Sequence, residues 1–167
     1  MSAVVTPSAP FKWIWAPTPN DPDHIRILGG WDTTNITTVW CDPLKQHITL
    51  NHQAVDDVLA WLKELSESTN PDGTTLLQTL GHFDGSYNPR YKRGLPHDQN
   101  PAHLSNHSAG FALDFNAKHF PLGVPASPTD PVHDIVPIAK RHNMRFGGEY
   151  IHRPDPMHWD HVLSPFP

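Results

Sequence analysis

The sequence predicts an α+β fold, a single domain in which a small antiparallel sheet is flanked by helices. Segments rich in the β-branched and aromatic residues typical of strands are mixed with segments whose apolar residues recur at helical spacing. These segments do not show the regular strand–helix–strand alternation of a parallel α/β sheet. A length of 167 residues is sufficient for one domain with a substantial core.

The composition argues against several classes of protein. The net charge is −5 with histidine neutral and lysine and arginine form no run, so we expect no nucleic-acid partner. Cys41 is the one cysteine, which excludes an internal disulfide. No apolar stretch approaches the roughly 20 residues needed to cross a bilayer, and residues 1–15 lack the features of a secretory signal peptide. We therefore expect no membrane insertion, and we expect a monomer.

The N-terminal part is predicted to contain a lead-in followed by a hairpin. Residues 1–30 are expected to be an irregular, proline-rich segment, because residues 16–23 combine three prolines with three turn-forming acids or amides. The domain itself would then comprise residues 31–167. Residues 37–41 and 47–50 are short β-branched or aromatic runs separated by a turn, which predicts a β-hairpin.

Two helices are predicted. The first would begin after an N-cap at Asn51 and end near residue 66, with apolar residues at helical spacing, namely Val55, Val58, Leu59, Leu62 and Leu65. The second would begin near Pro131, with Val132, Ile135, Val136 and Ala139 facing the core. Pro137 makes the middle of this second helix uncertain, because proline removes a helical hydrogen bond.

The remaining sequence predicts one long loop and three further strands. Residues 81–105 are expected to be loop, because glycine, proline and amide residues occur throughout. Residues 110–116, 145–151 and 157–163 are expected to be strands.

His107 and Asp114 are predicted to converge. If residues 111–116 form a strand, Phe111, Leu113 and Phe115 share an apolar face, and Asp114 lies on the other. Gly110 can adopt the positive φ that would bring His107 back over the face of Asp114. Imidazole and carboxylate would then meet as zinc ligands do. The alternative is that Asp114 caps a turn and that His107 is a surface histidine.

A third ligand is expected from residues 149–161. His158 lies three residues after Asp155, and two prolines restrict the backbone on either side of that acid. A catalytic zinc needs three protein ligands, an open position for water and a carboxylate that can take the proton of that water. His107, Asp114 and His158 would be the ligands of one zinc per chain, and Asp155 the general base. Thirteen histidines make chance matches easy, so this pattern does not exclude a simple turn.

Three ordered motifs resemble a known family. "SNHSAGFALDFN" (residues 105–116) resembles the Ser-x-His-x-x-Gly-x-Ala-x-Asp pattern of zinc peptidases that cut peptidoglycan peptides, the D-Ala-D-Ala carboxypeptidases and L-alanyl-D-glutamate endopeptidases. "DPMHWD" (residues 155–160) resembles their second motif, and "GSYNPRYKRG" (residues 85–94) resembles the segment upstream of the first motif in the endopeptidase branch. The resemblance implies a fold related to the hedgehog signalling domain.

The resemblance also implies roles for individual residues. His107, Asp114 and His158 match the zinc ligands, and Asp155 matches the general base. Arg90 or Arg93 matches an arginine that binds a substrate carboxylate or the oxyanion, and we prefer Arg90. Ser105 matches the motif serine and is expected to support the ligands. The insertion-like residues 95–103 depart from the family pattern and put the shape of the substrate cleft in doubt.

The implied function is hydrolysis of a peptide bond in peptidoglycan stem peptides. Three bonds stay open as the site of cleavage: L-Ala-D-Glu, D-Ala-D-Ala and a cross-bridge bond. Without a signal peptide, such an enzyme resembles a bacteriophage endolysin, made in the host cytoplasm and released to the cell wall through a holin. Two alternatives stay open: a non-catalytic hedgehog-like module that keeps zinc for structure or binding, and an unrelated hydrolase that uses Asp and His without metal.

Overall fold

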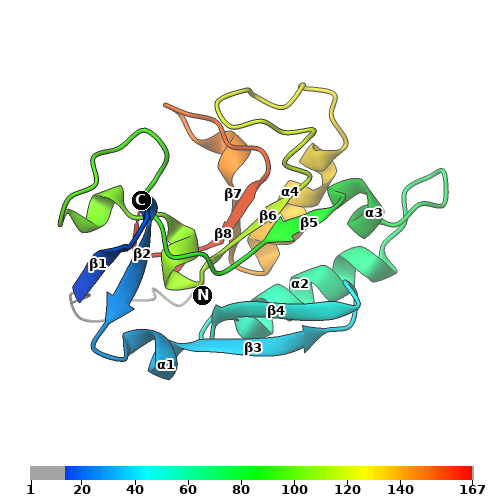
Figure 1. Cartoon of the computed structure of the whole chain (residues 1–167). Helices are drawn as coiled ribbons and strands as arrows, with labels where there is room; N and C mark the ends of the chain where they lie inside the picture. Colours follow the sequence, from blue (N-terminus) through cyan, green and yellow to red (C-terminus); the bar gives the residue numbers. More distant parts are fainter. Residues whose placement is uncertain (1–13, 167) are drawn as a thin grey trace, which may run out of the picture.

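The computed structural model describes residues 14–166, which contain eight strands and four α-helices (Figure 1). In chain order these are β1 (Ile14–Thr18), β2 (Asp21–Leu28), α1 (Trp31–Asn35), β3 (Ile36–Cys41), β4 (Gln46–Asn51), α2 (Val55–Glu67), α3 (Leu76–Leu80), β5 (Phe83–Gly85), β6 (Ala112–Phe115), α4 (Val132–Arg141), β7 (Met144–Phe146) and β8 (His158–His161). Short 3-10 helices are η1 (Pro101–His103), η2 (Asn106–Ala109) and η3 (Gly147–Glu149). Most of the N-terminal stretch in which we expected no signal peptide lies outside the described residues.

A four-stranded antiparallel sheet with strand order β5-β6-β8-β7 forms the centre of the molecule. Phe111, Leu113 and Phe115 are buried, as the predicted alternation requires, while Asp114 on the other face of β6 keeps 20% of its side chain exposed. The predicted α+β class, with small antiparallel sheets and helices in one domain, is confirmed. The sheet therefore has one face for the core and one for chemistry.

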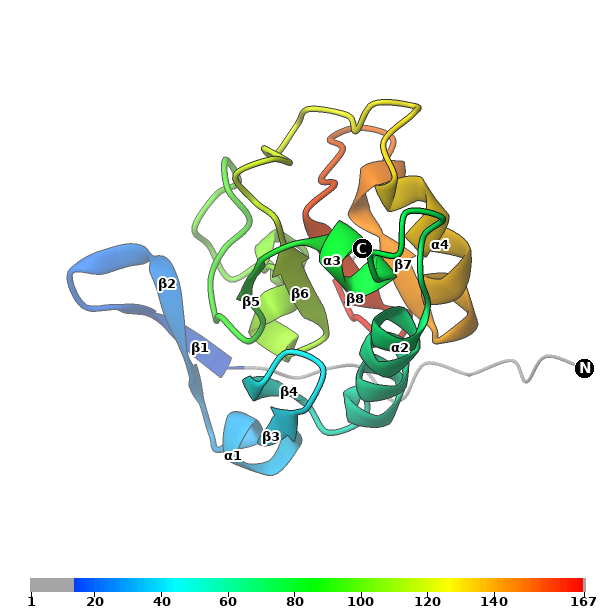
Figure 2. The same cartoon turned by 90° about the vertical axis from the view of Figure 1, so that its right-hand side faces the viewer.

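Helices α2, α3 and α4 lie together on one side of the sheet (Figure 2). Trp61 of α2 is fully buried, and its ring centroid lies 5.1 Å from that of Trp159 on β8 and 6.1 Å from that of Phe115 on β6. Helix α4 continues through the exposed Pro137, so the uncertainty about its middle is resolved in favour of one helix. Among residues 14–166, no helix has both the length and the apolar character needed to traverse a bilayer.

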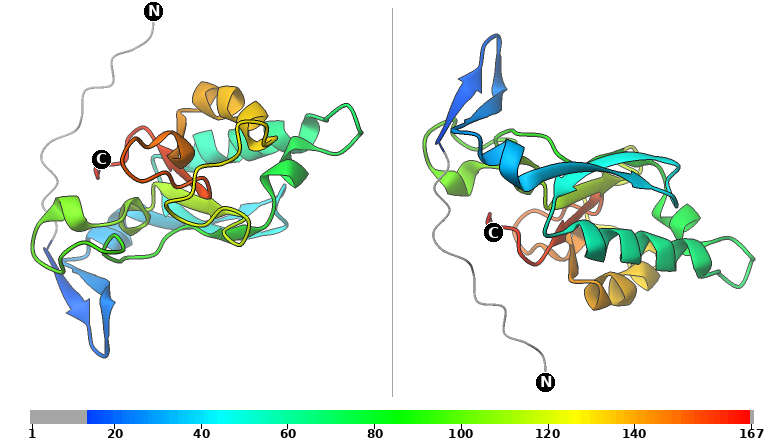
Figure 3. Two further views of the ribbon diagram at one scale, coloured as in Figure 1. Left: turned by 90° about the horizontal axis from the view of Figure 1, so that it is seen from above. Right: turned by 90° about the horizontal axis from the view of Figure 1, so that it is seen from below.

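The part of the N-terminal lead-in that the structure describes differs from the prediction, and residues 1–13 lie outside the described residues. Residues 14–28 are not irregular but form the antiparallel hairpin β1–β2, which projects at one end of the molecule (Figure 3). The hairpin is fixed to the loop that carries Arg90, because Ile25 N donates to Pro89 O at 3.0 Å and Tyr91 N donates to Asp23 O at 3.0 Å. Pro17 lies within β1 opposite Ile25, and Pro22 lies within β2. Proline is tolerated in such a two-stranded edge, which a count of prolines does not reveal.

The predicted hairpin of residues 37–50 is confirmed as β3–β4, but the helix that follows begins later than expected. Asn51 is the last residue of β4 rather than an N-cap. Its side chain instead accepts from Gln53 N at 3.1 Å and donates to Ala109 O at 3.2 Å, and α2 starts at Val55. Asn51 thereby joins β4 to the turn that carries His107.

Two other boundaries were also wrong. The predicted loop of residues 81–105 contains the short strand β5, which pairs with β6. The strand predicted over residues 145–151 ends at Phe146, because Gly147 O accepts hydrogen bonds from both Tyr150 N and Asp155 N and the chain turns there. Any side chain at position 147 would meet Asp155 O at 2.5 Å, so this glycine is required by close packing against the segment that carries Asp155 and His158.

Gly110 has the positive φ that was predicted, at 72°, and it also lies against β4. A Cβ atom at this position would be 2.5 Å from Asn51 N and 2.7 Å from Ile36 Cδ1. We expect Gly110→Ala to destabilise the protein by more than the 1–2 kcal/mol or so typical of left-handed strain alone, because backbone must also move. Gly73→Ala is the matched control, since Gly73 has φ 85° with open space around it. Thermal and urea unfolding measure both, and equal losses would show that the contact with β4 contributes nothing.

Candidate metal centre

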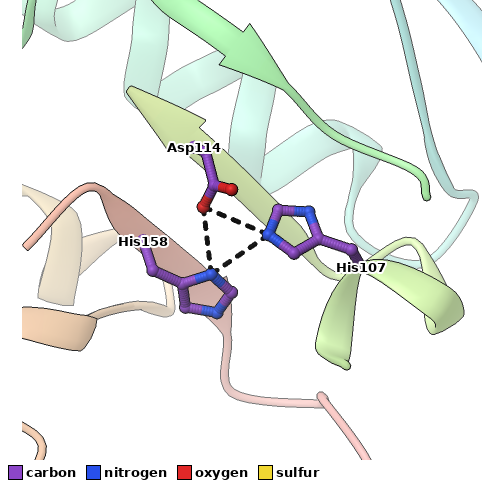
Figure 4. Close-up of side chains that lie close together, drawn as sticks. All are labelled: His107, Asp114 and His158. Carbon is purple, nitrogen blue, oxygen red and sulfur yellow. Dashed lines mark hydrogen bonds and ion pairs between the residues drawn. The ribbon is translucent and has the colours of Figure 1, made fainter. Parts of the chain in front are cut away.

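The structure brings together the three residues predicted to bind metal (Figure 4). His107 Nε2, His158 Nδ1 and Asp114 Oδ1 form a triangle in which each pair of atoms is 3.1 Å apart. Both histidines are buried, with 3% and 7% of their surface exposed. The three residues come from η2, β6 and β8, so the convergence is a product of the fold.

Strand pairing positions two of these residues. Asp114 and His158 are direct cross-strand partners in the antiparallel pair β6–β8, so their side chains emerge side by side on the same face. His107 lies outside these two strands, on the turn that ends at Gly110. Ser105 caps this turn by accepting from His107 N at 3.4 Å. The expected supporting role of Ser105 is thus seen as a contact to the backbone of a ligand residue.

The donor atoms at the centre suit a cation. His107 Nδ1 lies 2.6 Å from Ser86 O, and because a carbonyl only accepts, Nδ1 carries the proton. In the neutral ring, Nε2 then presents its lone pair toward Asp114. Burial opposes the charged form of Asp114, but the two imidazoles outweigh it and lower the pKa of this carboxyl below its usual 3.8, so the group is ionised. A neutral imidazole lone pair and a carboxylate oxygen at 3.1 Å repel each other, so this spacing fits either a metal ion between the two atoms or a proton on the imidazole nitrogen.

The dimensions fit zinc. Zinc–nitrogen bonds of about 2.0–2.1 Å in a tetrahedron put neighbouring ligand atoms about 3.3 Å apart, close to the observed triangle. The Ser86 carbonyl that holds His107 in one tautomer is the kind of outer partner that metal-binding histidines use. Three protein ligands leave one position for water or substrate, as in catalytic zinc sites.

Asp155 lies beside the centre and lines the same pocket as Asp114 and His158. Its Oδ1 is buried and has no hydrogen-bond partner among the described residues. Burial raises the pKa of Asp155; His158 opposes this rise, and the charge of Asp114 adds to it. A carboxylate that is close to the ligands and unengaged is what a general base requires.

The other two acids near the second motif are already engaged. Glu149 forms an ion pair with Lys140 at 2.8 Å, and Asp160 is fully buried in an ion pair with Arg145 at 2.6 Å. Asp155 is therefore the acid that the geometry leaves available.

A pocket of about 450 Å³ opens over the centre. Its wall carries four basic side chains, from Arg90, Lys92, Arg93 and Arg153, in addition to the acids of the centre. Such a wall favours a substrate that presents carboxylate or carbonyl oxygen. The insertion-like residues 95–103 contribute none of the residues that line this pocket.

Arg90 and Arg93 both line the pocket, but they are held differently. The Arg90 backbone is tied to the motif turn at three points, since Ser105 N donates to Arg90 O and Ser108 Oγ bonds to both Arg90 N and Arg90 O, at 2.9–3.0 Å. Burial lowers the pKa of the half-buried Arg90 guanidinium, while Asp114 acts in the opposite direction. Arg93 is exposed, and its carbonyl accepts from Arg153 Nη1 at 2.5 Å. Arg90 is thus the better positioned arginine.

Several residues of the site were not predicted. Ser86 lies within the third motif but had no role assigned, and only the fold places its carbonyl against His107. Arg153 and Tyr150 line the pocket although no pattern marked them. The buried network of Asn106, Asp160 and Arg145 was also missed, since its members are up to 54 residues apart in sequence.

The other histidines do not join the centre. His97 stacks on Tyr91, and His103 pairs with Asp98 at 2.8 Å; neither lines the pocket. His161 pairs with Asp57 at 2.9 Å.

Comparison with known proteins agrees with the motifs. Residues 98–161 match a family model described as D-alanyl-D-alanine carboxypeptidase, and this segment includes His107, Asp114, Asp155 and His158. No curated protein and no solved structure matches the chain. The family predicted from the motifs is confirmed over this segment, which begins after the loop that carries Arg90 and Arg93.

Proposed function

From the premise that residues 98–161 carry a D-alanyl-D-alanine carboxypeptidase domain, we propose that this protein is a zinc-dependent peptidase that hydrolyses a peptide bond in peptidoglycan stem peptides. One observation carries the proposal: two imidazole nitrogens and one carboxylate oxygen meet within 3.1 Å, at a pocket that also contains the unengaged Asp155. A site that served structure alone would have no use for that acid.

Different residues of the site have different roles in the proposed reaction. His107 Nε2, Asp114 Oδ1 and His158 Nδ1 would hold zinc, which when bound acts as a Lewis acid and lowers the pKa of a water molecule toward about 7. Asp155 takes a proton from the attacking water as the new carbon–oxygen bond forms at the scissile carbonyl. Asp155 then gives this proton to the leaving nitrogen as the carbon–nitrogen bond breaks. Arg90 donates hydrogen bonds to the developing oxyanion or to a substrate carboxylate.

Digestion of purified peptidoglycan followed by mass spectrometry tests the proposal. We expect new termini at one type of bond, L-Ala-D-Glu, D-Ala-D-Ala or a cross-bridge bond, with activity lost on chelation and restored by zinc. Binding of zinc and stem peptide without cleavage would favour the non-catalytic hedgehog-like module. Cleavage that survives complete removal of metal would favour a hydrolase that uses Asp and His alone.

We further propose that the protein acts as a bacteriophage endolysin. The support is the resemblance of residues 85–94 to the endopeptidase branch of the family. Expression in bacterial cytoplasm is expected to lyse cells only when a holin is expressed with it. Lysis of the culture at the same rate without a holin would contradict this route to the wall.

The two arginines should respond differently to a change that keeps their charge. Lysine loses the planar two-point contact of guanidinium, so we expect Arg90→Lys to lower kcat/KM about tenfold or more, within the range for a charged hydrogen bond. Arg93→Lys should stay within about twofold, because Arg93 is exposed. The measurement is kcat/KM on a defined stem-peptide fragment, with zinc content checked in both. A loss confined to Arg93→Lys would reverse the assignment, and no loss in either would remove arginine from the mechanism.

A further inference from the structure

Asn106 occupies an unusual position in the pocket wall. It lies between Ser105 and His107 in the turn of the first motif, and only 7% of its surface is exposed. Its Nδ2 donates to Asp160 Oδ2 at 2.7 Å. Its Oδ1 is buried and has no hydrogen-bond partner within residues 14–166. Because most buried polar atoms are paired, this amide oxygen indicates a missing partner.

The orientation of this amide is determined by its surroundings. Asp160 is fully buried, and both of its oxygens accept from Arg145, Oδ2 from Nη2 at 2.6 Å and Oδ1 from Nε at 3.1 Å. Turning the Asn106 amide over would place two oxygens 2.7 Å apart. Arg145 and Asp160 therefore hold the amide nitrogen on one side and leave the amide oxygen on the other.

Asn51 shows what a buried asparagine with a purely structural role looks like here. It is 2% exposed, its Nδ2 donates to Ala109 O and its Oδ1 accepts from Gln53 N. Both ends of that amide are satisfied within the fold. Asn106 differs because it lines the pocket and its buried Oδ1 has no hydrogen-bond partner among the described residues.

We propose that Asn106 is a substrate-binding residue whose side-chain oxygen accepts a hydrogen bond from a backbone N–H of the substrate peptide. The inference rests on the proposed peptidase function and adds to it the residue that accepts a hydrogen bond from a peptide N–H. A substrate ammonium group is disfavoured, because Arg90, Lys92, Arg93 and Arg153 line the same pocket and would repel it. The basic side chains would thus address oxygens of the substrate, while Asn106 addresses a neutral N–H.

Peptides in which one N–H is removed at a time test this directly. A stem-peptide fragment is compared with analogues in which each backbone amide in turn is an ester, and binding is measured by calorimetry. The protein carries Asp155→Asn to limit turnover, and mass spectrometry checks that the ligand stays intact. We expect one ester to bind about five- to tenfold more weakly than the amide, as for one neutral hydrogen bond. This difference should vanish in the protein that also carries Asn106→Ala, and it should persist with Asn51→Ala.

The outcomes separate this inference from the function on which it rests. Equal binding of every ester would overturn it, even if Asn106→Ala failed to fold, and so would an ester penalty that persisted in Asn106→Ala. A penalty that appeared instead on acetylating the free amino groups of the peptide, and that vanished in Asn106→Ala, would reassign the oxygen to an ammonium group and overturn the proposal. No binding of any fragment and no cleavage of peptidoglycan by the unmodified protein would overturn the proposed function together with this inference.

Discussion

His107→Ala and His158→Ala are each expected to lose bound zinc and, with it, hydrolysis down to background. Either change leaves two of the three atoms that now meet at 3.1 Å. Loss of an outer partner of a metal ligand typically costs 10–100-fold in affinity, so loss of a ligand should cost more than about 100-fold. Metal analysis after dialysis measures the first effect, and peptidoglycan digestion the second.

His119→Ala is the matched control, because this histidine is 60% exposed and pairs with Asp130 away from the centre. It should retain one zinc per chain and full activity. Full zinc occupancy in both His107→Ala and His158→Ala would show that metal binds elsewhere or not at all.

Asp155→Asn is expected to keep zinc and to lower kcat by about 10²–10⁴-fold, the usual contribution of a general base. The amide is almost the same size as the carboxyl but cannot accept the proton of water. Because Asp155 is not among the three ligand residues, the metal content should not change. Steady-state kinetics with parallel metal analysis measure both quantities.

Asp134→Asn provides the control, since Asp134 is exposed in the first turn of α4. Near-normal turnover in Asp155→Asn would place the base elsewhere. Glu149 and Asp160 are the other acids near the second motif, and they already pair with Lys140 and Arg145, respectively.

The ligands could be predicted because the relevant information is local. Alternation along residues 111–116 is sufficient to separate Asp114 from its apolar neighbours, and a glycine between His107 and Asp114 marks the turn. The convergence of His158 could not be derived in this way, because it depends on which strands pair and in which register. His158 was predicted as a ligand from the order of the motifs, which resembles that of the family.

The parts that were missed depend on long-range contacts. The β1–β2 hairpin is held by Trp15 Nε1 donating to Tyr91 Oη at 3.1 Å and by backbone bonds to the loop of Arg90, which no pattern within residues 14–28 encodes. Asparagine is a residue type that often caps helices, but the side-chain amide of Asn51 donates to Ala109 O, 58 residues away. In both places tertiary hydrogen bonds decide the local structure that propensity alone leaves open.

The direct pairing of Asp114 with His158 sets which changes of length this protein tolerates. Residues 116–157 connect the two strands, and the stretch 123–125 is exposed. An insertion there lengthens a connection, and even doubling a flexible connection costs only about 0.6 kcal/mol. Deleting one residue next to His158 would instead place Trp159 beside Asp114 and turn the imidazole into the core. Natural or engineered variants can therefore differ widely in this loop, while every homologue that keeps the centre must keep the register of two four-residue strands.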